Sequence, residues 1–112
     1  MKINDVLKGK SKEDILSSMK NLKPNDLLFK SIEVSFLLGV KKAIEIGANV
    51  HAHDDYALRE ASGNGHKEIV ELLLKNGANV HAQNDFALHW ASQFGYLNIV
   101  DILLKNGANK RR

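Results

Sequence analysis

The chain contains no cysteine, one proline and no long run of apolar residues. Without cysteine there is no disulfide, no thiolate metal ligand and no cysteine nucleophile, so a reducing compartment suits the chain. No stretch approaches the roughly 18 consecutive apolar residues that a membrane-spanning helix needs. The start, Met1-Lys2-Ile3-Asn4-Asp5, has no apolar run, so we expect no secretory signal. These absences favour the cytoplasm of a cell or of a host cell.

Aromatic residues are also few, at 6% of 112 residues, and charge of one sign hardly dominates. Lysine and arginine number 16 against 13 acidic residues, which gives a net charge of +3. That balance permits weak attraction to polyanions without indicating it. A nucleic-acid interface needs a continuous basic stripe with interleaved aromatics, and the basic residues here are scattered. We therefore do not expect nucleic acid as a partner.

What the sequence does contain is an internal repeat of 30 residues. Asn49-Val50-His51-Ala52 recurs as Asn79-Val80-His81-Ala82, and residues 49–78 match residues 79–108 at 18 of 30 positions. Self-similarity at a period of this size is typical of a solenoid of stacked units. Solenoids present extended surfaces, so the first expectation is a protein that binds another macromolecule.

One repeat is predicted to form a helix, a tight turn, a second helix and a connector. Asp54-Asp55 is expected to cap the first helix, because a carboxylate can accept hydrogen bonds from the free amides of the first turn. Gly63-Asn64-Gly65 breaks that helix, the apolar residues of 69–74 form the second, and Gly77 ends it. The segment 50–52 is expected to be a short extended link.

These patterns divide the chain into three parts. We expect an N-terminal capping helix region at 1–24, a repeat array at 25–109 and a basic tail at 110–112. Within the array, an eroded repeat at 25–48 precedes the repeats at 49–78 and 79–108.

Three runs of the sequence resemble ankyrin repeats: Leu88–Tyr96, Leu58–His66 with its Gly65-His66 pair, and Ile69–Asn79. The resemblance covers about residues 25–109. It implies an all-α helix-turn-helix solenoid of about three repeats with no catalytic activity. The usual unit of the family is about 33 residues, and three are missing here between the second helix and the next first helix. This short form is similar to the arrays of large DNA viruses and some intracellular bacteria.

The resemblance also implies where a protein partner binds, namely on the concave face made by the first helices. The family's variable first-helix positions correspond to Glu60, Gly63 and Asn64 in one repeat and to Trp90, Gln93 and Phe94 in the next. Arg59 and Glu60 are either a polar rim of this surface or a solvated helix face, and the partner-binding residues that we expect are Arg59, Glu60, Asn64, Trp90, Gln93 and Phe94. Phe86, Trp90 and Phe94 are four residues apart and so share one helix face. We expect Phe94 on the surface and Phe86 in the core. Trp90 is either an exposed binding residue or packed between neighbouring repeats.

The last repeat suggests a second kind of association. It keeps the apolar residues of an internal repeat, although a terminal repeat usually has a polar outer side. We therefore predict self-association, in the simplest case as a homodimer, through Phe94, Ile99 and Leu103. The alternatives are that another partner covers this end or that its exposure is tolerated.

Catalytic, cofactor and metal sites are not predicted. The serines lack the context of a nucleophile elbow, and the glycines at helix ends do not form a phosphate loop. His51 and His81 are repeat equivalents, so they should lie roughly 10 Å apart, the spacing of packed helices. His51 and His53 supply only two ligands, too few for a strong metal site.

Overall fold

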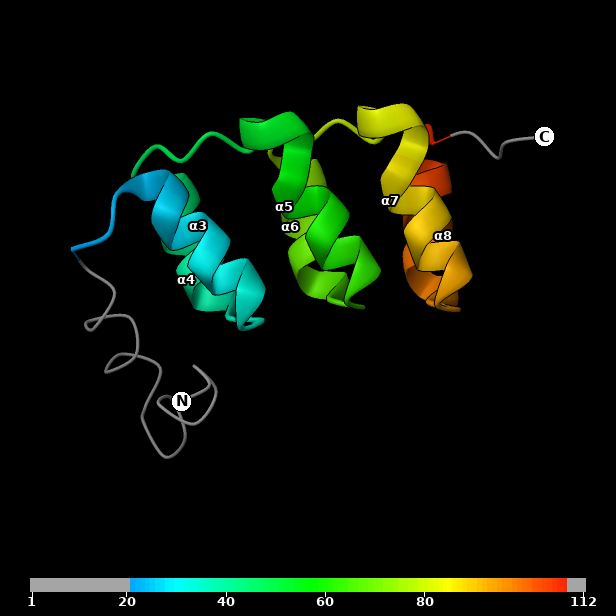
Figure 1. Ribbon diagram of the computed structural model, residues 1–112, viewed down its shortest axis with the longest axis horizontal. Helices are drawn as coiled ribbons and strands as arrows, with labels where there is room; N and C mark the ends of the chain where they lie inside the picture. The colour runs from blue at the N-terminus through cyan, green and yellow to red at the C-terminus, as the bar shows by residue number, and fades with distance from the viewer. Residues whose placement is uncertain (1–20, 109–112) are drawn as a thin grey trace. The chain divides into compact units, whose positions relative to one another are not determined.

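The computed structural model describes residues 21–108, where it contains helices and turns and no strand. The helices are α3 (Pro24–Glu33), α4 (Leu37–Glu45), α5 (Ala52–Gly63), α6 (Lys67–Lys75), α7 (Ala82–Gln93) and α8 (Leu97–Lys105). They pair as α3 with α4, α5 with α6 and α7 with α8, here called the first, second and third repeats (Figure 1). The predicted all-α class is confirmed. The expected N-terminal capping helix and basic tail fall outside the described residues.

The first repeat is a compact unit by itself. Its first helix begins at Pro24, where the missing N–H costs nothing because the first amides of a helix have no partner within it. Leu27, Leu28 and Ile32 are buried against the second helix of the pair. The two helices approach closely because Gly39 has no side chain: a Cβ there would overlap Ser31 Oγ.

The second and third repeats form the other unit, in which α5 lies beside α7 and α6 beside α8 (Figure 1). The predicted second helices are present and end alike. After α6, Gly77 has φ of +92°, and the N–H of Ala78 donates to the carbonyl of Leu73 at 3.0 Å. This geometry satisfies carbonyl groups that a helix end would leave without donors. The core of this unit comprises Leu58, Ile69, Val70, Leu73, Leu88, Ile99 and Leu103.

The connectors between repeats differ from the extended links that we expected. Residues 50–51 form a turn, and three consecutive residues inside the next helix then adopt left-handed backbone angles. The φ angles are 55–57° for residues 53–55 and 57–61° for residues 83–85. Five of these six residues are His, Asn or Asp, the non-glycine types most often found in this region. With three residues fewer than the usual repeat, the chain reverses at once instead of extending first.

The acidic residues at these turns also have a different role from the expected one. Neither α5 nor α7 has a side-chain hydrogen bond at its N-cap. Asp55 is buried instead, and its Oδ2 accepts the backbone N–H of Asn79 at 2.8 Å. Its Oδ1 lies 3.0 Å from Nδ1 of His51. Asp54 is exposed and accepts a hydrogen bond from the amide of Gln83 at 2.7 Å. The left-handed turn directs both carboxylates away from the helix amides.

The contact between Asp55 and Asn79 recurs in the first repeat. Asn25, thirty residues before Asp55, accepts the backbone N–H of Asn49 through Oδ1, also at 2.8 Å. In both repeats a side chain at the start of the first helix thus holds the backbone that leaves the second helix. We call this hydrogen bond the closing bond of the repeat.

Candidate partner-binding site

Four aromatic side chains form a row on the third repeat. Phe86, Trp90 and Phe94 follow at intervals of four residues along α7 and its C-cap, and Tyr96 lies just beyond the turn. The ring centroids of Phe86 and Trp90 are 5.1 Å apart in an edge-to-face arrangement. Those of Trp90 and Phe94 are 6.1 Å apart, and those of Phe94 and Tyr96 6.2 Å. We call these four residues the aromatic strip.

The two phenylalanines of the strip are its exposed members. Phe94 is 52% exposed and Phe86 is 38% exposed, while Trp90 and Tyr96 are half-buried. The expectation that Phe86 belongs to the core is wrong. The residues on either side of Phe86 in the sequence, Asp85 and Ala87, are buried. Because these two residues take the inward positions, the side chain of Phe86 is left on the outside.

Trp90 lies between the repeats, which decides between the two alternatives left open by the sequence. A Cβ placed on Gly63 would come within 2.5 Å of the indole ring, so glycine leaves the space that the ring occupies. A similar contact joins Gly65 and Tyr96, because a Cβ placed on Gly65 would lie 2.9 Å from the Tyr96 ring. The strip therefore packs against the second repeat on one side and keeps its phenylalanines exposed.

Arg59 connects the strip to the left-handed turn of the second repeat. Its Nε donates to the carbonyl of Asp54 at 3.0 Å and its Nη2 to the carbonyl of His53 at 2.9 Å. The guanidinium lies 5.6 Å from the ring centroid of Phe86 and 5.8 Å from that of Tyr56. Such distances allow a cation–π attraction to both rings. Arg59 thus stabilises the turn while it flanks the strip.

The remaining predicted site residues lie on the same two first helices. Asn64 donates to Glu60 Oε2 at 3.2 Å, so these two side chains contact each other. Gln93 is exposed beside Phe94. His66, which follows this turn, is half-buried, and desolvation lowers its pKa below 6.5, while the nearby negative charge of Glu60 opposes that shift.

Sequence reasoning missed Tyr56, Phe86 and Tyr96 as parts of this surface. The spacing of residues 86, 90 and 94 was visible in the sequence, but the contact of Tyr96 with Phe94 crosses a turn. Tyr56, 36% exposed, lies beside the guanidinium of Arg59 and so borders the surface. A periodic pattern along one helix predicts neither of these two contacts.

The residues predicted for self-association do not lie together on an exposed end. Ile99 is 1% exposed and Leu103 is fully buried, so both belong to the core of their own unit. Other residues of the third repeat are more exposed than their counterparts in the second. Ser92 is exposed where Ser62 is buried, and Val100 is half-buried where Val70 is buried.

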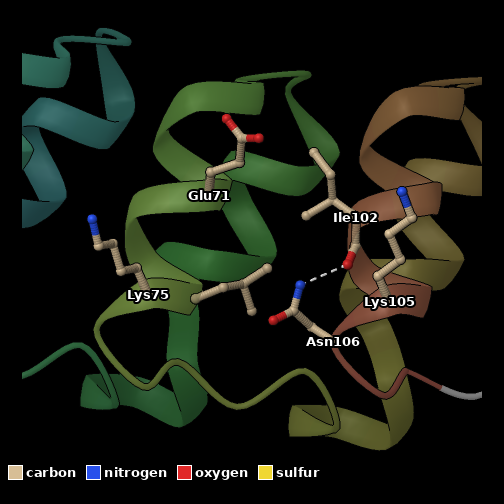
Figure 2. A pocket seen from close by; sticks show the side chains of 6 residues that line it. Glu71, Lys75, Ile102, Lys105 and Asn106 are labelled. Carbon is tan, nitrogen blue, oxygen red and sulfur yellow. Dashed lines mark hydrogen bonds between the residues drawn. The ribbon is translucent and has the colours of Figure 1, made fainter.

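The second helices border a groove of about 380 Å³ on α6 and α8 (Figure 2). Its lining comprises Glu71, Leu74, Lys75, Ile102, Lys105 and Asn106. The amide of Asn106 donates to the carbonyl of Ile102 at 2.8 Å, and the ammonium of Lys105 is 3.1 Å from a carboxylate oxygen of Asp101. Because both signs of charge occur in and around the groove, its electrostatics select no particular ligand.

Between residues 21 and 108 the structure contains no group of three or more histidine, cysteine or acidic side chains that could hold a metal ion. Within the same residues, no helix has the length and apolar character required to cross a membrane.

The paired helices, the recurrent closing bond and the packing of α5 beside α7 define a helical repeat protein. A family model described as ankyrin repeats (three copies) matches residues 30–112. The match covers more than half of the chain, which therefore belongs to the ankyrin repeat family. Ankyrin repeats are generally protein–protein interaction modules. The comparison with curated proteins gave no match.

Proposed function

We propose that this chain is a non-enzymatic binding module that holds a protein partner on the aromatic strip and Gln93. The observation that carries the proposal is the exposure of Phe94 and Phe86 within a row of contacting rings. Aromatic side chains dominate the energetics of many interfaces, and a ring held by its neighbours loses little conformational entropy when a partner covers it. The cytoplasm is the compartment that fits the absence of cysteine.

The other predicted site residues support this surface in different ways. Arg59 is a positioning residue in the proposal, because two of its N–H groups bond to the carbonyls of residues 53 and 54 and so hold the turn. Glu60 and Asn64 form a polar border in the second repeat. Phe94 and Gln93 are exposed and contribute the direct contacts. Trp90 is half-buried against Gly63 and contributes the part of its ring that remains exposed.

A selection from a random peptide library displayed on phage tests the proposal, because it does not require the partner to be identified first. Wild type and Phe94→Ala are used as baits, with Ile46→Ala as the matched control. Ile46 is an exposed apolar residue, at 44%, and follows α4 of the first repeat. We expect peptides that bind wild type and Ile46→Ala and lose about tenfold in affinity for Phe94→Ala, as at a binding hot spot. Peptides that bind all three equally would refute the proposal.

A second candidate function is assembly through the third repeat. Ser92 and Val100 are more exposed than Ser62 and Val70, their counterparts in the second repeat, and this difference favours assembly. Ser62 and Val70 belong to a repeat that has a neighbour within its unit, and a second copy of the chain would provide such a neighbour for Ser92 and Val100. Sedimentation equilibrium over a concentration series tests it with wild type and Phe94→Lys. A homodimer that Phe94→Lys abolishes supports assembly, and a monomer in both cases eliminates it. Leu103→Lys is unsuitable because Leu103 is buried.

A further inference from the structure

Trp90 of the aromatic strip and the neighbouring Gln93 carry hydrogen-bond donors that residues 21–108 do not use. The indole N–H of Trp90 makes no hydrogen bond within residues 21–108, and it is not fully buried. This N–H is therefore accessible to an external acceptor. The amide of Gln93, three residues along the same helix, likewise has no hydrogen bond within the described part of the chain. An indole can only donate, so the surface favours a ligand with exposed acceptors.

The spacing of the rings provides a second, independent constraint. The steps from Phe86 to Trp90 and from Trp90 to Phe94 are 5.1 and 6.1 Å, and the ring planes meet at 72° and 43°. The strip thus presents a row of inclined apolar rings, of which Phe86 and Phe94 are exposed to an apolar ligand. A polyproline II helix rises about 3.1 Å per residue, so a segment of about four residues can extend along the three rings.

Proline-rich segments meet both constraints. A proline residue has a carbonyl acceptor and no N–H, and the polyproline II helix makes no internal hydrogen bonds. Its carbonyls therefore remain free to accept hydrogen bonds from a surface. Its pyrrolidine rings are compact and apolar, and aromatic surfaces bind such rings. The segment is also largely ordered before it binds, which reduces the entropic cost.

We propose that the aromatic strip binds a proline-rich segment of a partner protein in the polyproline II conformation. Prolyl rings contact Phe86, Trp90 and Phe94, and ligand carbonyls accept hydrogen bonds from the indole N–H of Trp90 and the amide of Gln93. The inference rests on the proposed function, since it names the class of partner that the same surface takes.

Other ligands match the surface less well. An amphipathic helix satisfies its own backbone groups, so it would cover the indole N–H without offering a carbonyl, and a buried donor without a partner costs about 1–3 kcal/mol. An acidic ligand would find one nearby cation, Arg59, which also donates two hydrogen bonds to backbone carbonyls, and it would leave the apolar rings without matching groups.

Trp90 is the only tryptophan of the chain, so its fluorescence reports directly on the strip. The probe is a short peptide of Pro-Pro-Leu repeats, and the matched ligand has every proline replaced by alanine. We expect a saturable change in Trp90 fluorescence with the proline peptide and none with the alanine peptide. Phe94→Ala should weaken binding about tenfold, Gln93→Ala several-fold, and Ile46→Ala not at all. Phe94, Gln93 and Ile46 are exposed, so these variants should fold.

Equal binding of the proline and alanine peptides would overturn the inference, and so would a proline peptide that leaves the fluorescence unchanged. The phage selection distinguishes this failure from failure of the proposed function. If the selected peptides lack proline but depend on Phe94, the strip is a binding site for another class of peptide. If they bind Phe94→Ala as well as wild type, the strip is not the binding site and both proposals fail.

Discussion

Ser62 and Ser92 occupy the same position of successive repeats and have different surroundings. The hydroxyl of Ser62 is buried and has no hydrogen-bond partner, whereas Ser92 is exposed. A buried polar atom without a partner is destabilising, because water would otherwise have satisfied it. We expect Ser62→Ala to raise the free energy of unfolding by about 1 kcal/mol. Ser92→Ala, the matched control, should change it by less than about 0.5 kcal/mol. Urea denaturation provides both values, and a less stable Ser62→Ala would contradict the assignment.

His66 makes the stability of the second repeat depend on pH. Its pKa is lowered in the folded state, chiefly by desolvation, so the unfolded chain binds the proton more readily. Stability is therefore fully present above the unfolded pKa of about 6.5 and decreases as the pH falls through that value toward the folded pKa.

Urea midpoints measured between pH 5 and pH 8 test this dependence. We expect the midpoint to fall at acidic pH in wild type and to fall less in His66→Gln, which cannot titrate at that position. His89→Gln is the control, because it makes the same substitution at an exposed histidine of the third repeat. A wild type and a His66→Gln with the same pH profile would exclude His66 as the source.

The left-handed turns are the element that the shortened repeat depends on. Asn84 has φ of 57° and is exposed, so its backbone angle rather than its packing constrains the residue type. A β-branched residue is strained there by about 1–2 kcal/mol, whereas glycine is not. We expect Asn84→Val to lower the free energy of unfolding by that amount and Asn84→Gly to leave it nearly unchanged. Glu68→Val, at an exposed position of α6, controls for valine in a helix. Equal effects of valine at both positions would argue against the turn.

The closing bond of the second repeat predicts a graded response at Asp55. Asp55→Ala removes the carboxylate that accepts the backbone N–H of Asn79 and should cost about 1–3 kcal/mol, as for a part-buried hydrogen bond to a charged group. Asp55→Asn should cost less, because Asn25 makes the equivalent bond with an amide oxygen. Asp54→Ala, which removes only the exposed contact with Gln83, should cost less than about 1 kcal/mol. Thermal unfolding of the three variants checks this order; equal losses in Asp55→Asn and Asp55→Ala would show that the closing bond needs the carboxylate itself.

At the scale of the whole molecule, the contact between Gly63 and Trp90 joins the second and third repeats. The Cβ of Gly63→Ala would lie 2.5 Å from the indole ring, so the ring must shift. We expect a loss of about 1–3 kcal/mol, as for overpacking in a core, and a changed fluorescence of Trp90. Gln93→Ala is the matched control, because residue 93 is exposed at the same position of the third repeat. A Gly63→Ala protein with wild-type stability and fluorescence would contradict the contact.

Much of the fold was predictable because helix periodicity is local. The apolar residues of 69–74 and 99–104 recur at helical spacing, and the glycines that end these helices stand at fixed positions. The exposure of Phe94 followed from its place at the end of the first helix. The site was predicted only in part. Phe86 was assigned to the core, and Arg59 was not expected to hold a turn, since both outcomes depend on backbone angles at residues 53–55 and 83–85.

The sequence by itself determined the 30-residue period, the paired helices, the family and the positions of the candidate binding residues. A repeated pattern of apolar residues and glycines is sufficient for these, because each element forms from neighbours along the chain. Only the tertiary structure decided that Asp55 closes its repeat, that Trp90 lies against Gly63 and that Arg59 flanks the aromatic strip. Each of these contacts joins residues from different turns, helices or repeats, and such pairings depend on how the chain reverses between elements.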